Sequence, residues 1–221
     1  CDDADLDRAV GVAALSAYSN AGQRCASGSR LIVFDAVYDE FKQRLLDHTS
    51  ELTLGTGNDD DLGPVINARQ LEDMVLAVER ARIAGATVLA GGRRSTETAH
   101  QNGFFMQPTL IEGAAGDAEI SQAELFGPIA CLYRVSGFAN ALALANQSPF
   151  GLTAAIHTRN VHRAMTFLGR IKSGVASING PTYGSEPHMP FGGLRQSGTG
   201  WREAGTEALD VYSDWKTIYI H

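Results

Sequence analysis

The apolar residues of this chain repeat with two different periods, and the two periods alternate along its length. Some stretches carry an apolar residue at every third or fourth position, which is the period of a helix that packs on one face. Others are short apolar runs bounded by Gly, Asp or Asn, which is typical of strands. The pattern predicts helices over residues 6–20, 35–51, 67–84, 139–146 and 161–171. It predicts strands or extended segments over residues 30–34, 87–90, 104–111, 129–135, 152–157, 174–179 and 209–220.

Polar residues at the ends of these stretches indicate where the helices begin and end. The acidic run over residues 2–5 can cap the first helix, Asp35 the second and Asn67 the third. Gly85 ends the third helix, since glycine readily adopts the left-handed conformation of a helix C-terminus. Residues 180–200 are rich in Gly, Pro and Ser and are predicted to form a long ordered loop.

Helices and strands that alternate in this way predict an α/β fold. We expect a three-layer αβα domain with a mostly parallel sheet. The last predicted strand, over residues 209–220, carries bulky side chains such as Tyr212 and Trp215 but has no partner nearby in the sequence. An exposed edge strand is a liability unless it is covered or paired with another chain.

Composition narrows the classes of protein to which the chain can belong. Its 221 residues are 44% hydrophobic and 19% charged, which is ordinary for a soluble globular protein. The formal net charge of −7 is spread along the chain without a basic stripe, which argues against a nucleic-acid partner. No run approaches the roughly 20 apolar residues that a membrane span needs, and no signal peptide is visible, so we expect no membrane partner.

The three cysteines, Cys1, Cys25 and Cys131, show no Cys-x-x-Cys spacing. They fit neither a disulfide framework nor a zinc site, and the six histidines show no metal-binding spacing. We therefore expect a reducing, cytoplasmic compartment and no metal. The first residue is Cys rather than Met, and the chain opens directly into a helix start, so we expect a fragment of a longer protein.

One of these thiols stands at a junction between two predicted elements. The segment Gly22-Gln23-Arg24-Cys25 follows the first helix and precedes the strand over residues 30–34. A side chain at such a junction can be exposed at the rim of a sheet, where α/β proteins place their chemistry. A free cysteine is more often a small buried hydrophobe, so the position alone leaves both interpretations open. A nucleophilic pair of Cys25 with His188, from the long loop, is a further possibility.

Two further segments could contact a nucleotide. Residues 192–200 are rich in glycine, but Glu203 stands where Gly-x-Gly-x-x-Gly requires its last glycine, so a packed irregular loop is favoured. Glu124 and Phe126 lie two positions apart just before a predicted strand, and in extended backbone such positions face the same side. A carboxylate beside a ring suits a ribose and a flat heterocycle, although a charged turn next to a core phenylalanine is the more frequent case.

Three of these segments, considered as a set, resemble the aldehyde dehydrogenase superfamily. They are Asn20-Ala21-Gly22-Gln23-Arg24-Cys25, Glu124-Leu125-Phe126-Gly127-Pro128 and Pro190-Phe191-Gly192-Gly193, in the family's order and at its approximate spacing. The acidic start over residues 2–7, the segment 104–109 and Gly151-Leu152-Thr153-Ala154 are also similar to the family. The resemblance covers the whole chain, and the chain corresponds to about the C-terminal half of a family member.

The resemblance implies an NAD(P)-dependent oxidation of an aldehyde to a carboxylic acid. Cys25 would be the nucleophile that forms a thiohemiacetal and then a thioester, with its backbone N–H as an oxyanion donor. Glu124 and Phe126 would contact the ribose of NAD or NADP, and Gln70, on a looser match, would be a further cofactor contact. The residues that would shape the substrate pocket are Arg24, Ala26 and Phe191.

The resemblance also implies a division of the chain. Residues 1–205 would be the catalytic domain, and residues 206–221 an oligomerisation strand shared between the subunits of a homodimer or homotetramer. The family's cofactor-binding domain and the glutamate that activates the deacylating water would lie upstream, outside this chain. Residues 212–216 are similar to members that oxidise semialdehydes. Two departures are Arg195, where the family often has Lys, and an extra residue at Trp201.

Three hypotheses about function follow. In the first, a longer protein is an aldehyde dehydrogenase that acts on a small aldehyde or semialdehyde. In the second, it is a cysteine hydrolase or acyltransferase that uses Cys25 with His188. In the third, the isolated chain is a catalytically incomplete binding or assembly module. We favour the first for the longer protein and the third for the isolated chain, because the family's base and cofactor domain would be missing.

Overall fold

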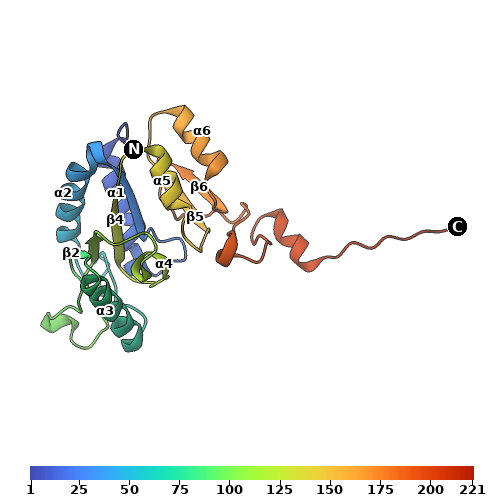
Figure 1. The fold of residues 1–221 in the computed structure, drawn as a ribbon. Coiled ribbons are helices and arrows are strands. Elements are labelled where there is room, and N and C mark those ends of the chain that lie inside the picture. Colours follow the sequence, from blue (N-terminus) through green and yellow to red (C-terminus); the bar gives the residue numbers. More distant parts are fainter.

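A four-stranded β-sheet forms the centre of the first 135 residues (Figure 1). The computed structural model describes all 221 residues. The strands of this sheet are β1 (Arg30–Phe34), β2 (Thr87–Ala90), β3 (Thr109–Glu112) and β4 (Ile129–Val135), in the order β1-β4-β3-β2. β4 pairs in parallel with both β1 and β3, whereas β2 runs antiparallel at the edge. The prediction of a mostly parallel sheet is therefore confirmed.

Helices cover both faces of this sheet, which confirms the three-layer αβα architecture. The two helices on one face are α1 (Leu6–Tyr18) and α2 (Asp35–Glu51). The two on the opposite face are α3 (Ala68–Ile83) and the short α4 (Glu119–Gln122). None of the helices combines the length and the apolar character that a membrane crossing requires.

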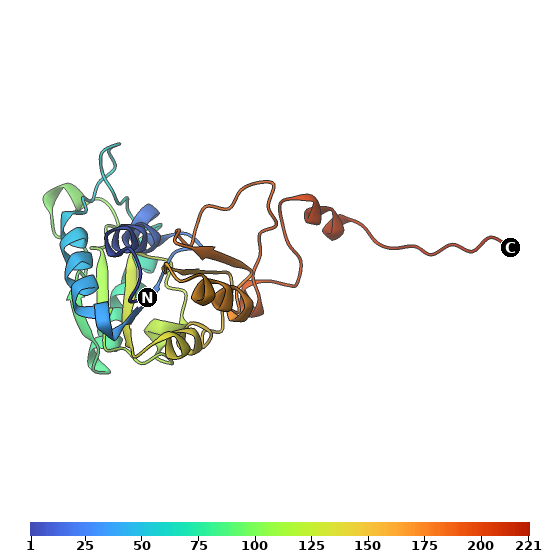
Figure 2. The same cartoon turned by 90° about the horizontal axis from the view of Figure 1, so that it is seen from above.

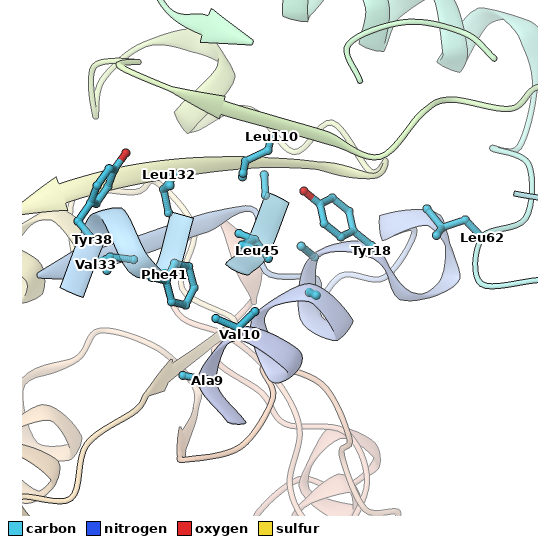
Figure 3. Close-up of a cluster of buried hydrophobic side chains, with 13 residues drawn as sticks. Ala9, Val10, Tyr18, Val33, Tyr38, Phe41, Leu45, Leu62, Leu110 and Leu132 are labelled. Carbon is cyan, nitrogen blue, oxygen red and sulfur yellow. The ribbon is translucent and has the colours of Figure 1, made fainter. Parts of the chain in front are cut away.

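Each face of the sheet carries its own hydrophobic cluster. Under α1 and α2, Tyr18 and Leu45 pack with Leu110 and Leu132 of the sheet (Figure 3). Leu132 points into this cluster, while its neighbour Cys131 points into the second cluster, under α3. The two residues diverge because successive side chains of a strand point to opposite faces. The nearly continuous apolar sequence of β4 is thus explained by burial on both sides.

A smaller α/β unit follows residue 135 and lies on the β1 side of the first sheet (Figures 1 and 2). Its strands and helices are β5 (Thr153–Ile156), β6 (Val175–Ile178), α5 (Phe138–Ala145) and α6 (Val161–Arg170). β5 and β6 pair in parallel as a separate two-stranded sheet. No backbone pairing joins the two sheets, so the strands form two sheets rather than the single one predicted.

The helix ends agree with the predicted caps at two of three sites. Asp5 caps α1 by accepting a hydrogen bond from the N–H of Arg8, and Asn67 caps α3 by accepting one from Gln70. The prediction for Asp35 was wrong. Asp35 is the first residue inside α2, where its charge complements the positive end of the helix dipole without a capping hydrogen bond.

The C-terminal end differs from the predicted strand over residues 209–220. Residues Thr206–Tyr212 form a 3-10 helix, η4, and residues 213–221 extend away from the body of the molecule without a strand partner in this chain (Figures 1 and 2). A strand needs such a partner, and the chain offers none there. The other 3-10 segments are η1 (Ser19–Gly22), η2 (Thr98–His100) and η3 (Arg195–Ser197), and the last lies in the predicted long loop.

Candidate active site

Cys25 lies just beyond a tight turn that follows α1. In this turn Asn20, Ala21 and Gly22 all have positive φ, at 55°, 51° and 67°. Positive φ is uncommon for residues with a Cβ, so two such residues in succession mark a strained conformation that the surrounding structure must maintain. The Asn20 side chain helps by donating to the Gln23 carbonyl over 3.0 Å. The Cys25 side chain emerges from this turn exposed.

The turn packs directly against the segment that contains Glu124. A Cβ added to Gly22 would lie 2.0 Å from the carbonyl oxygen of Gly127, so only glycine permits this approach. A Cβ on Gly127 would in turn lie 2.3 Å from the Met74 sulfur. Two motifs that are far apart in the sequence therefore meet backbone to backbone beside Cys25.

Glu124 and Phe126 stand exposed on the segment that leads into β4. Phe126 has a positive φ of 54°, and its side chain is 40% exposed, so it is not the core phenylalanine of the alternative interpretation. No hydrogen bond or ion pair within the chain engages the Glu124 carboxylate. Gln70 of α3 donates its side-chain N–H to the Leu125 carbonyl over 2.6 Å and thereby anchors the segment that contains Glu124 and Phe126 to α3.

A cavity of about 550 Å³ opens at this contact. The predicted site residues that line it are Arg24, Cys25, Glu124 and Phe126. The structure brings these four together from two distant segments. The predicted site residues outside the lining are Ala26, Gln70 and Phe191.

The residues outside the lining hold neighbouring backbone in place. Ala26 is buried, and its carbonyl accepts a hydrogen bond of 2.6 Å from the Thr182 hydroxyl. Phe191 pairs through its backbone with Glu203, over 2.7 and 2.9 Å. Thr182 thus anchors the long loop to the residue that follows Cys25 in the chain.

Two neighbours of Cys25 are fixed by contacts that the sequence did not reveal. The Arg24 guanidinium donates to the Ser19 hydroxyl over 3.2 Å and lies 4.6 Å from the ring centroid of Tyr183, a cation–π contact. The Gln23 side chain donates to the Pro64 carbonyl over 3.1 Å and also accepts a hydrogen bond from the chain at Ile66. An amide two positions before a candidate nucleophile could have been suspected, whereas nothing in the sequence points to Tyr183.

The site lies at the amino ends of its strands. Cys25 precedes β1 and Glu124 precedes β4, which is parallel to it. Ligands of open α/β sheets usually bind at the carboxyl ends. The prediction that the thiol is exposed at the rim of the sheet agrees with the structure, but the rim is the opposite one.

The other groups considered for nucleophilic chemistry lie elsewhere. His188 is exposed in the long loop, outside the cavity lining, and no hydrogen bond joins it to Cys25. Cys131 is buried, and burial raises the pKa of its thiol to about 11. Of the described cysteines, Cys25 is thus the exposed one that faces the cavity.

Comparisons with known proteins agree with this arrangement. The model of the aldehyde dehydrogenase family matches residues 1–218. The chain is 35% identical to the alpha-ketoglutaric semialdehyde dehydrogenase of Bacillus subtilis and 36% identical to the alpha-ketoglutarate semialdehyde dehydrogenase of Haloferax volcanii, over 99% of its own length. It superposes with a TM-score of 0.92, at 33% identity over 96% of its length, on betaine aldehyde dehydrogenase from Staphylococcus aureus in complex with NAD+.

These findings define the class of protein. The chain belongs to the aldehyde dehydrogenase family, which confirms the resemblance noted from its motifs. It spans about 45% of the two semialdehyde dehydrogenases and 42% of the Staphylococcus aureus chain.

Proposed function

We propose that these residues act in an NAD(P)-dependent aldehyde dehydrogenase longer than the 221 residues described, with Cys25 as the nucleophile. One observation carries the proposal: the contact between Gly22 and Gly127 places the Cys25 thiol and the Glu124 and Phe126 side chains around one cavity. Thiol chemistry and cofactor binding would then share a site. Membership of the aldehyde dehydrogenase family supports aldehyde oxidation as the reaction.

The chemistry of Cys25 follows in balanced steps. Its thiolate adds to the aldehyde carbonyl, which forms a C–S bond and an oxyanion. The Cys25 backbone N–H makes no hydrogen bond within the chain and is free to donate to that oxyanion. Collapse of the oxyanion expels a hydride and leaves a thioester, and water then breaks the C–S bond to release the acid and the thiol.

The residues present fit the cofactor that this reaction needs. When bound, NAD(P)+ supplies the acceptor for the hydride. The unpaired Glu124 carboxylate can accept hydrogen bonds from ribose hydroxyls, and the exposed Phe126 ring can pack beside the sugar. We propose that Gln70 acts by holding Leu125, and so the 124–126 segment, rather than by contacting the cofactor, because its amide N–H is already engaged.

The substrate class we propose is a semialdehyde that carries a carboxylate. Arg24 lines the same cavity as Cys25, and its guanidinium has no carboxylate partner in the chain. A guanidinium is well suited to bind a carboxylate. Ala26 and Phe191 would shape the pocket only through the backbone positions that they occupy.

For assembly, we propose a homodimer or homotetramer in the cytoplasm, with residues 206–221 as the segment that pairs with a neighbouring subunit. Its support is the run of exposed apolar side chains there: Tyr212, Trp215, Ile218, Tyr219 and Ile220. An extended apolar segment without a partner favours strand pairing with another chain. Removal of residues 213–221 should lower the molecular mass measured by light scattering, and an unchanged mass would contradict this role.

The activity is tested by NADH formation in the longer protein, with a carboxylate-bearing semialdehyde and with betaine aldehyde as substrates. We expect Cys25→Ala to lower turnover by at least about 10³-fold, because the covalent intermediate cannot form. Cys131→Ala, which removes a buried thiol on the far side of β4, should keep turnover and serves as the control. Undiminished NADH formation in Cys25→Ala would overturn the proposal.

An esterase assay and the same NADH assay address the two other hypotheses. A cysteine hydrolase would cleave esters without nucleotide and would lose this activity in His188→Ala; we expect no such dependence, because His188 lies outside the cavity lining. We expect no aldehyde oxidation by the 221-residue chain alone. Measurable turnover by that chain would overturn the third hypothesis.

A further inference from the structure

The long loop that follows β6 contacts both neighbours of Cys25 in the chain. Its residue Thr182 donates its hydroxyl to the Ala26 carbonyl over 2.6 Å. The next residue, Tyr183, presents its ring to Arg24, and the central carbon of the guanidinium lies 4.6 Å from the ring centroid. Two consecutive loop residues therefore hold the positions on either side of the candidate nucleophile.

The ring of Tyr183 is held in place by the residue before it and not by the residues after it. The backbone N–H of Thr182 donates to the hydroxyl of Ser16 in α1 over 3.4 Å, and Tyr183 itself is partly buried. Residues 184–189 are all exposed, and they begin with Gly184, whose φ is 103°. Tyr183 is thus the last anchored residue before an exposed stretch of the loop.

The Arg24 guanidinium is held at two points and still has free donors. The Ser19 hydroxyl accepts a hydrogen bond from it over 3.2 Å, and the Tyr183 ring lies against it. No acidic side chain of the chain pairs with it, although Arg24 lines the cavity beside Cys25. A guanidinium has several N–H donors, and stacking on an aromatic ring uses its face and leaves its edge for a carboxylate.

Holding this guanidinium in advance would favour the binding of a carboxylate. A free arginine side chain has many rotamers, and it loses this freedom when it binds a ligand. Arg24 has already lost part of it to Ser19 and Tyr183, so a carboxylate would bind with a smaller loss of entropy. A neutral aldehyde has no group for the guanidinium and would gain nothing from this arrangement.

We propose that Tyr183 is a positioning residue, which orients Arg24 for the carboxylate of a semialdehyde and so sets the preference for acidic over neutral aldehydes. Ser19 assists it through the hydrogen bond to the same guanidinium. The Tyr183 hydroxyl makes no hydrogen bond within the chain, so the ring carries this role. The inference rests on the proposed function, because it requires Arg24 to bind the substrate carboxylate.

The test compares two aldehydes in the NADH assay of the longer protein. They are glutaric semialdehyde and pentanal, which has the same chain length but a methyl group in place of the carboxylate. The measured quantity is the ratio of their kcat/KM values, here called the acid preference. We expect Tyr183→Leu to lower the acid preference by at least about threefold, through a higher KM for glutaric semialdehyde, because the cation–π contact is lost.

Two further variants and a control assign this loss to the contact with Arg24. Tyr183→Phe retains the ring and should retain the acid preference, whereas Ser19→Ala should lower it by about twofold. Met189→Ala, at an exposed position of the same loop, is the control and should leave the acid preference unchanged. Equal losses of kcat/KM for both aldehydes in Tyr183→Leu would overturn the proposal, because the ring would then only support the fold of the loop.

Arg24→Met separates this inference from the proposed substrate class. We expect this variant to lower the acid preference by at least about tenfold. Tyr183→Leu should have no further effect in that background, because the ring then has no cation to hold. A loss in Arg24→Met with none in Tyr183→Leu would overturn the role of Tyr183 and leave the substrate class standing. An unchanged acid preference in Arg24→Met would contradict the substrate class and, with it, this inference.

Discussion

The two halves of this molecule are buried to very different degrees, although both have apolar sequences. Only six of the 46 buried residues lie after residue 135. In the first half, helices cover both faces of a four-stranded sheet; in the second, two short strands form a separate sheet, and residues of β5 and α5 line the cavity that extends from Cys25. The difference shows that apolar helices and strands do not make a core unless their edges and faces have partners. The candidate active site is built on the well-packed half and opens towards the other.

The largest expected contrast between the halves comes from shortening one leucine in each. Leu110 is fully buried between α1, α2 and the sheet, so Leu110→Ala should lower the free energy of unfolding by about 2–5 kcal/mol. Leu142 is only partly buried and lines the cavity, so Leu142→Ala should lower the free energy of unfolding by less than about 1 kcal/mol. Urea unfolding monitored by circular dichroism measures both. Equal losses would show that α5 is packed as firmly as the first half.

A second contrast concerns the contact that forms the site. Gly22→Ala places a Cβ against the Gly127 carbonyl at positive φ and should lower the free energy of unfolding by about 2–4 kcal/mol. Gly11 lies inside α1 with nothing within 4 Å of an added Cβ, so Gly11→Ala should stabilise by about 0.5–1 kcal/mol. The same urea titration compares them. A neutral Gly22→Ala would mean that the two motifs are not held together by this approach.

The smallest effect tests the polar junction between the halves. Burial raises the pKa of Asp3, but hydrogen bonds from the Thr158 hydroxyl and the Arg159 N–H, together with the Arg163 charge, outweigh it and hold the pKa below its usual range. Asp3→Asn should therefore lower the free energy of unfolding by about 1–2 kcal/mol.

The pH dependence of that loss has a definite sign. Since the pKa of Asp3 is lowered in the folded state, its contribution is present above the ordinary aspartate pKa of about 4 and is lost as the pH falls through the folded value. The difference in the free energy of unfolding between wild type and Asp3→Asn should therefore become smaller as the pH is lowered. Asp59→Asn, in an exposed loop, is the control. If the difference in the free energy of unfolding between the two proteins stays constant down to pH 2, Asp3 stabilises the fold through the shape of its side chain and not through its charge.

The sequence predicts most of the first half because local rules decide its elements. The cap at Asn67, the helical period of α3 and the apolar run of β4 all agree with the structure. The predicted strand over residues 209–220 does not form in this structure. Local sequence patterns could not predict this result, because a strand also needs a neighbouring strand to pair with, and the chain offers none there. The split into two sheets could not be predicted either, because sequence patterns indicate which residues form strands but not which strands pair with one another.

The candidate site was predicted only in part for a similar reason. Cys25, Glu124 and Phe126 could be selected because their residue types suit the chemistry and the motifs resemble a family. The roles of Tyr183 and Thr182, which hold Arg24 and the carbonyl of residue 26, depend on contacts between distant segments. No local pattern encodes such contacts.

The most direct test of the central claim is to detect the acyl group on Cys25. The longer protein, mixed with aldehyde and NAD+ and quenched in acid within one turnover, is digested and analysed by peptide mass spectrometry. We predict a mass increase equal to the acyl group on the peptide that contains Cys25 and none on the peptides that contain Cys1 or Cys131. NADH formation with no acyl group on Cys25, or with the acyl group on another residue, would contradict the account.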